Sequence, residues 1–68
     1  MIQVNKLKAL FVEKNLTQQN VANYLGITET TMSRKMQKGV FDSEEIYKMI
    51  RLLDIKNPTE IFFAEKVN

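Results

Sequence analysis

Cysteine, histidine and tryptophan are absent from this sequence of 68 residues, which contains only one proline and two glycines. The lack of cysteine excludes disulfides, thiolate zinc sites and a cysteine nucleophile. The lack of histidine removes the most common metal ligand and general base. No apolar run approaches the roughly 18 residues of a membrane-spanning helix, and the N-terminal lysines lie among apolar residues, unlike those of a signal peptide. We therefore expect a protein of the reducing cytoplasm without metal, cofactor or small-molecule substrate.

The residues that are present have the composition of one small globular domain. Apolar residues make up 44% and charged residues 26% of the chain, which are ordinary proportions for a folded protein. A domain of this length buries only about 60% of its unfolded surface, and we expect residues 1–68 to form that single domain. The net charge of +2 is compatible with a polyanionic partner but does not by itself indicate one.

Apolar spacing predicts five short helices, and no strand-like alternation persists along the chain. Four of the helices begin at a residue that can act as N-cap by accepting a hydrogen bond from a free backbone N–H. Glu45 and Glu60, three residues after the caps of the last two helices, predict capping boxes there. The expected N-caps are Thr17, Thr28, Asp42 and Asn57, with Pro58 at the first helical position of the fifth helix. The helices are expected at about residues 3–14, 18–25, 29–37, 43–53 and from residue 58 onward.

The second and third helices are expected to form a close pair. Only residues 26–28 separate them, and so short a turn makes two helices cross at a steep angle. Gly26 permits the sharp turn because glycine adopts positive φ without a steric penalty, and Asn15 and Gly39 are expected to end the neighbouring helices in the same way. The residues expected to face inward on the pair are Val21, Ala22, Leu25, Met32 and Met36.

The third helix carries a polar stripe opposite its two inward methionines. The stripe residues fall at i, i+1, i+4 and i+5 and therefore share one face. Their side-chain types can reach base edges in a DNA major groove: arginine bonds guanine, glutamate accepts from cytosine, and threonine touches the thymine methyl group. The stripe consists of Glu29, Thr30, Ser33 and Arg34. It predicts an interface with double-stranded DNA.

A wider pattern covers the chain from about Leu7 to Phe63. Its residues are Leu7, Leu10, Leu16-Thr17-Gln18, Val21-Ala22, Leu25-Gly26-Ile27, Met32-Ser33-Arg34 and the segment 57–63. This pattern resembles the helix-turn-helix of the phage repressor and Cro family, also called the xenobiotic-response-element-type family. The resemblance implies an all-α, lambda-repressor-like bundle of five helices, in which the second and third form the helix-turn-helix.

The resemblance also implies roles for individual residues. In the family, the glutamine that opens the second helix bonds a DNA phosphate, and the first residues of the third helix read bases. The base contacts implied here are Glu29, Thr30, Ser33 and Arg34. The phosphate contacts expected here are Gln18, Thr28, Lys35 and Lys38.

The chain departs from the family pattern at Lys35 and at Phe11, which is apolar where the family often has a polar residue, and Glu29 is also unusual. Lys35 stands where the family usually has an apolar residue, so we expect Lys35 at the DNA phosphates and Met36 as the last buried contact of the helix, packed against Phe11. Glu29 is unusual at the entrance of a groove because its charge repels phosphate. It either reads cytosine or rejects competing sequences.

Phe62 and Phe63 cannot both point into the core, because consecutive residues lie about 100° apart around a helix. One is expected inside, and the other is expected to be covered by the C-terminal tail or by a second subunit. We therefore expect a homodimer whose interface includes Ile61, Phe62 and Phe63.

These features predict a phage- or mobile-element-type transcriptional repressor or regulator that binds a palindromic operator as a homodimer. An alternative is a protein-interaction module, such as an antirepressor- or antitoxin-like adaptor, that keeps the helix-turn-helix shape. The low net charge, Glu29 and the apolar C-terminal segment leave this alternative open. An enzyme is not expected, because the carboxylates occupy caps and helix faces and no nucleophile–base pair is present.

Overall fold

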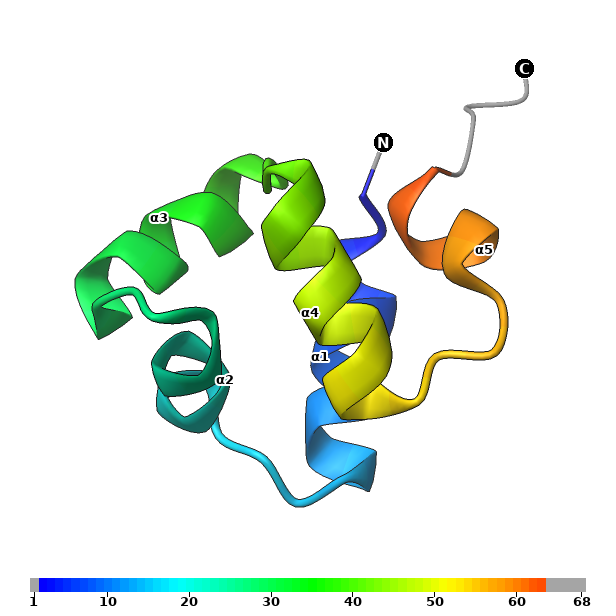
Figure 1. Cartoon of the computed structure of the whole chain (residues 1–68), viewed down its shortest axis with the longest axis horizontal. Helices are drawn as coiled ribbons and strands as arrows, with labels where there is room; N and C mark the ends of the chain where they lie inside the picture. Colours follow the sequence, from blue (N-terminus) through cyan, green and yellow to red (C-terminus); the bar gives the residue numbers. More distant parts are fainter. Residues whose placement is uncertain (1, 64–68) are drawn as a thin grey trace.

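The computed structural model describes residues 2–63 and contains five helices joined by short turns (Figure 1). The helices are α1 (Val4–Glu13), α2 (Gln18–Leu25), α3 (Glu29–Lys38), α4 (Ser43–Leu53) and α5 (Pro58–Phe62). No strand occurs in this part of the chain. The all-α, five-helix fold predicted from the sequence is therefore confirmed.

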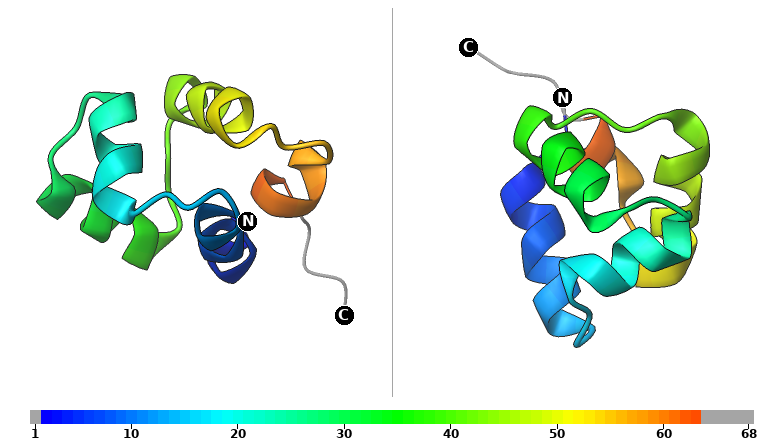
Figure 2. Two further views of the ribbon diagram at one scale, coloured as in Figure 1. Left: turned by 90° about the horizontal axis from the view of Figure 1, so that it is seen from below. Right: turned by 90° about the vertical axis from the view of Figure 1, so that its left-hand side faces the viewer.

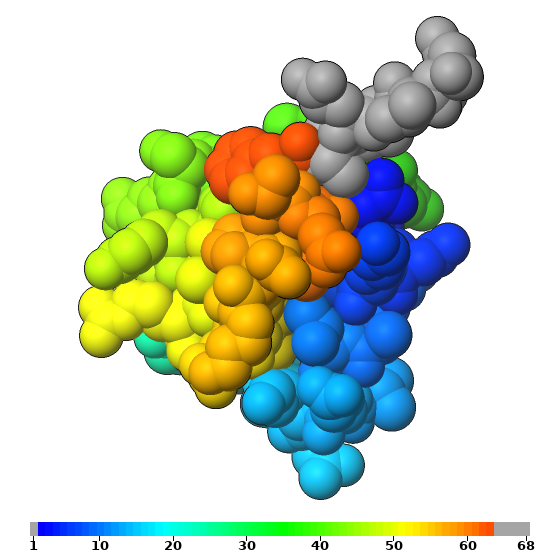
Figure 3. All heavy atoms as spheres, turned by 90° about the vertical axis from the view of Figure 1, so that its right-hand side faces the viewer, coloured from blue at the N-terminus to red at the C-terminus, as the bar shows by residue number. Residues whose placement is uncertain are grey.

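The helices are arranged so that α3 lies at one edge of the molecule. Figures 1 and 2 show α2 and α3 together at one end, α1 and α4 in the middle, and α5 at the other end. The packed pairs include α2 with α3, α2 with α4, and α1 with α5. Figure 3 shows the end opposite to α3, where α5 lies over α1 and α4. None of the described helices has both the length and the apolar composition needed to cross a bilayer.

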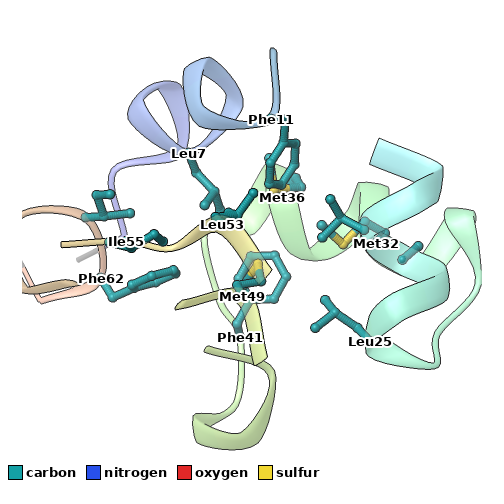
Figure 4. Packing of buried hydrophobic residues seen from close by; sticks show 13 residues of the cluster. Leu7, Phe11, Leu25, Met32, Met36, Phe41, Met49, Leu53, Ile55 and Phe62 are labelled. Atoms are coloured by element: carbon teal, nitrogen blue, oxygen red, sulfur yellow. The ribbon is translucent and has the colours of Figure 1, made fainter. Parts of the chain in front are cut away.

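A single cluster of buried apolar side chains, to which all five helices contribute, forms the core (Figure 4). Met32 of α3 and Met49 of α4 are fully covered. Phe11 points toward Met36, as the sequence predicts, and both side chains are buried. The cluster consists of Leu7, Phe11, Val21, Ala22, Leu25, Met32, Met36, Phe41, Met49, Leu53, Ile55, Ile61 and Phe62.

Three of the predicted N-caps form hydrogen bonds that explain where their helices begin. The Thr17 hydroxyl accepts from the Asn20 N–H at 3.0 Å, and the Asn20 side chain accepts in return from the Thr17 N–H at 2.9 Å. Asp42 and Glu45 form the predicted capping box at the start of α4. The third of these caps is Thr28, at the start of α3.

The predicted capping box of α5 is wrong. Asn57 forms no side-chain cap, because its backbone (φ −124°, ψ 74°) departs from the extended conformation of the other three caps, and Pro58 begins the helix without it. The helix α4 ends at Leu53 as expected, and Asp54 follows it in the left-handed conformation at φ 51°. The backbone conformation of the loop between α4 and α5 therefore could not be predicted from the presence of Asn57 before Pro58.

The turn between α2 and α3 depends on the positive φ of Gly26. Gly26 has φ 77°, and a Cβ at this position would meet nothing within 4 Å. The substitution Gly26→Ala therefore adds backbone strain without a side-chain clash. We expect it to lower the free energy of unfolding by about 1 kcal/mol, measured by urea denaturation. Asn23→Ala, an exposed change in α2, is the matched control; equal losses for the two variants would contradict the expectation.

Candidate nucleic-acid interface

The outer face of α3 presents the polar stripe that the sequence predicts. Met32 and Met36 are the buried residues of α3, and Glu29, Thr30 and Arg34 are exposed on other sides of the helix. Ser33, the fourth stripe residue, is half-buried. The right-hand view of Figure 2 shows α3 and α2 on the side of the molecule that faces the viewer. The stripe thus lies on the outer face of α3, and α3 packs against α2.

A hydrogen bond joins the first residue of α2 to the first residue of α3. The Gln18 Nε2 donates to Glu29 Oε2 at 2.8 Å, although the two residues are eleven positions apart. An amide nitrogen carries two protons, so Gln18 can hold Glu29 and still donate to another acceptor. The residue expected to bind phosphate and a residue expected to read bases are thereby brought together, which no local pattern in the sequence indicates.

The hydroxyl of Thr28 is used inside the chain. It accepts from the Thr31 N–H at 3.1 Å as the N-cap of α3 and donates its proton to Thr31 Oγ1 at 2.9 Å. A phosphate oxygen needs a donor, and the one hydroxyl proton of Thr28 is already engaged. The Thr28 side chain caps α3 in this structure, and its contact with a DNA phosphate stays a prediction.

Lys35 is also placed differently from its expected role. Its Nζ lies 2.8 Å from Glu45 Oε1 of α4, and the exposed fractions of the two side chains are 28% and 9%. Lys35 therefore points toward α4 and away from the stripe, because its position on α3 faces the neighbouring helix. The structure thus shows an ion pair that the sequence did not predict, and the expected phosphate contact of Lys35 stays a prediction. A lysine at a position that is usually apolar in the family indicated that Lys35 is unusual. The spacing of residues along one helix did not predict that Glu45 would be its partner.

The helix α3 is one of two parts of the chain with an excess of positive charge; the other is α1 with Lys14, where Lys6, Lys8 and Lys14 outnumber Glu13. Of ten basic and eight acidic residues in the chain, α3 contains three and one, which leaves seven of each elsewhere. The net charge of +2 therefore equals the net charge of this helix. Because Lys35 is paired with Glu45, the exposed cations of α3 are Arg34 and Lys38, the latter in the last turn.

The C-terminal aromatic residues divide as the sequence predicts. Phe62 is buried and Phe63 is 57% exposed, with the two ring centroids 6.5 Å apart. Ile61 is buried in the same core as Phe62. Two of the three residues expected at a dimer interface thus belong to the core of the monomer, since the helix turns them inward against α1. Of the three residues expected at a dimer interface, Phe63 is the one whose side chain is exposed for contact with a second protomer.

A groove of about 390 Å³ lies far from the stripe, between the C-terminal end of α1 and the segment that joins α4 to α5. Its lining combines apolar side chains with acidic and basic ones. The lining residues are Leu10, Glu13, Lys14, Leu53, Asp54, Ile55, Lys56, Asn57, Glu60 and Ile61. None of them belongs to the stripe, so the outer face of α3 is a convex surface separate from this groove.

Comparison with known proteins gives one match. Residues 2–65 match a family described as "Protein of unknown function (DUF739)". The chain belongs to this family. No curated protein and no solved structure matches it. The DUF739 match includes all five helices, so the paired α2 and α3 and the stripe on α3 lie within the part of the chain that the family covers.

Proposed function

We propose that this chain binds double-stranded DNA sequence-specifically, with α3 as the recognition helix in the major groove. It would act in the cytoplasm as a phage- or mobile-element-type transcriptional regulator of the repressor and Cro kind. The observation that carries the proposal is the exposure of Thr30 and Arg34 on a helix whose opposite face holds only Met32 and Met36 in the core. A convex helix with such a face has the shape and donors that a major groove accepts.

The charge distribution supports a polyanionic partner at this face. Arg34 and Lys38 are exposed cations on α3, and Lys6, Lys8 and Lys14 are exposed cations in the N-terminal part of the chain. DNA carries one negative charge for about every 1.7 Å of its helix axis, so attraction to phosphates dominates its binding to proteins. The exposed cations of α3 would contribute to this attraction.

The bond between Gln18 and Glu29 supports a specific use of the acidic residue. A carboxylate that faces a groove is repelled by phosphates but accepts a hydrogen bond from the N4 amino group of cytosine. Gln18 holds Glu29 Oε2 at 2.8 Å, and the second amide proton of Gln18 is suited to a phosphate oxygen. One glutamine would thus bind the DNA backbone and orient a base-reading side chain.

The proposal includes a homodimer on a palindromic operator. Helix-turn-helix dimers place their recognition helices in half-sites about one helical turn, roughly 34 Å, apart. The exposed Phe63 is an apolar side chain of the kind that a second protomer would cover. Mass measurement in solution, with and without Phe63→Ser, tests this part of the proposal.

Replacing Lys38 by alanine is expected to weaken binding to every duplex by a similar factor. Lys38 would contact phosphate, and phosphate contacts carry no direct sequence information. Titration of a labelled operator and a random duplex at several salt concentrations should show the loss in both and a salt slope smaller by about one per lysine removed.

Lys56→Ala is the matched control for Lys38→Ala. It removes the same charge from the segment that joins α4 to α5, which lies on the other side of the molecule from α3 (Figure 1). The control is expected to leave the slope unchanged. If both variants lose affinity equally, Lys38 acts only through net charge, and its assignment to the interface is wrong.

A further inference from the structure

The attachment of α3 to the rest of the protein has few directional contacts; one is the Gln18–Glu29 bond, which holds only the exposed N-terminal end of the helix. Its only buried residues are Met32 and Met36. Methionine is unbranched and flexible, so it fills space well but fixes the rotation of a helix poorly. Side chains that read bases must be held within about 0.5 Å of their working positions. A recognition helix anchored by two methionines therefore needs a further constraint.

The ion pair between α3 and α4 supplies a constraint of this kind. Glu45 Oε1 accepts from Lys35 Nζ at 2.8 Å and also from the Asp42 backbone N–H at 2.9 Å. The Asp42 side chain accepts in turn from the Glu45 N–H at 2.8 Å. One carboxylate oxygen thus joins the body of α3, the turn after it and the first turn of α4.

Burial makes this contact sensitive to the rotation of α3. Glu45 as a whole residue is only 7% exposed, and it is the one charged residue within residues 2–63 that is buried. A buried carboxylate that loses its partner is strongly unfavourable, because solvent does not replace the lost interaction. A rotation of α3 that moves Lys35 away would leave the buried carboxylate of Glu45 without its cationic partner. The exposed pair Lys48–Glu44, at 3.5 Å, imposes no such penalty.

We propose that Lys35 and Glu45 are positioning residues for DNA recognition, which fix the rotation of α3 and thereby the direction of the stripe. Arg34 immediately precedes Lys35, so holding one side chain against α4 sets the direction of the other about 100° away around the helix. This role rests on the proposed DNA binding. It differs from the phosphate contact expected from the sequence, because Lys35 acts here through α3 without touching DNA.

The double variant Lys35→Met/Glu45→Gln tests this role. Glutamine keeps the capping box of α4, since its side-chain oxygen accepts from the Asp42 N–H as glutamate does. Methionine keeps most of the apolar stem of lysine, and the net charge stays the same because one cation and one anion are removed. The matched control is Lys48→Met/Glu44→Gln, which makes the same two changes in the exposed pair.

The measured quantity is the ratio of the affinities for the selected operator and for a random duplex of equal length. The double variant is expected to lower this ratio by about tenfold, within the range that one base-reading contact contributes. Its affinity for the random duplex should stay close to that of the wild type, because the cations that meet phosphates are unchanged. The control variant is expected to leave both affinities unchanged.

Each other outcome contradicts a distinct claim. An unchanged ratio in the folded double variant, or an equal loss for both duplexes, overturns the positioning role while DNA binding stands. A wild type that prefers no sequence overturns the proposed function itself, and the positioning role with it. Circular dichroism shows whether the double variant folds. Should it unfold, the single variant Lys35→Met, which removes the contact and leaves both capping residues of α4 in place, decides: a ratio equal to that of the wild type overturns the role.

Discussion

Raising the salt concentration from about 50 to 200 mM is expected to lower operator affinity by about 10³–10⁵-fold, if a dimer meets about 6–10 phosphates. The reason is that each phosphate neutralised by the protein releases condensed cations into solution, and added salt opposes that release. In a dimer, Arg34 and Lys38 of α3 would supply four of the cations that neutralise these phosphates, and other exposed lysines of each protomer would supply the rest. This is the largest change in DNA affinity that we expect for this protein.

The salt effect is measured as the slope of log K against log salt concentration. For the phosphate number above, the expected slope lies between about −5 and −9. Circular dichroism over the same salt range serves as the control that the protein stays folded. A slope near zero would contradict a phosphate-based interface and would favour a partner other than DNA.

The substitution Arg34→Ala is expected to abolish base preference at one position of each half-site. Arg34 is exposed on α3 and forms no ion pair within residues 2–63. A guanidinium group can bond O6 and N7 of guanine together, which contributes about 1–3 kcal/mol of discrimination against other bases. Its loss should therefore reduce the preference for that base pair by about 5–150-fold.

The Arg34 prediction is measured by comparing the sequences that the wild type and the variant select from a random pool. The matched control is Arg51→Ala on α4, where the guanidinium lies 5.7 Å from the centre of the Tyr47 ring. Both variants lose one positive charge. A loss of preference at every position of the site, or the same result from Arg51→Ala, would show that Arg34 does not read a base.

Local signals were sufficient to predict most of the fold. Thr17, Thr28 and Asp42 cap the helices that they were expected to begin. The positive φ values of Gly26 and Asn15 end α2 and α1 as predicted. A capping bond or a left-handed residue involves neighbours a few positions apart, so residue type and spacing determine it. The inward and outward faces of α3 follow from helical spacing in the same way.

The features that sequence reasoning missed arise from contacts between helices. The Lys35–Glu45 pair and the Gln18–Glu29 bond join residues ten and eleven positions apart on different helices. Their formation depends on how α3 packs against α4 and α2, which spacing along one helix does not determine. Asn57 failed as a cap for a similar reason, since the path of the chain between α4 and α5 sets its backbone conformation.

Selection of bound duplexes from a random pool, followed by the mass of the complex in solution, tests DNA recognition by α3 most directly. We expect enrichment of a palindrome whose half-site centres are about one helical turn, or roughly 34 Å, apart, bound by two protomers. The enriched sequence should change when Arg34 is replaced. A pool that stays random even at low salt would contradict DNA recognition and would support a protein-interaction module.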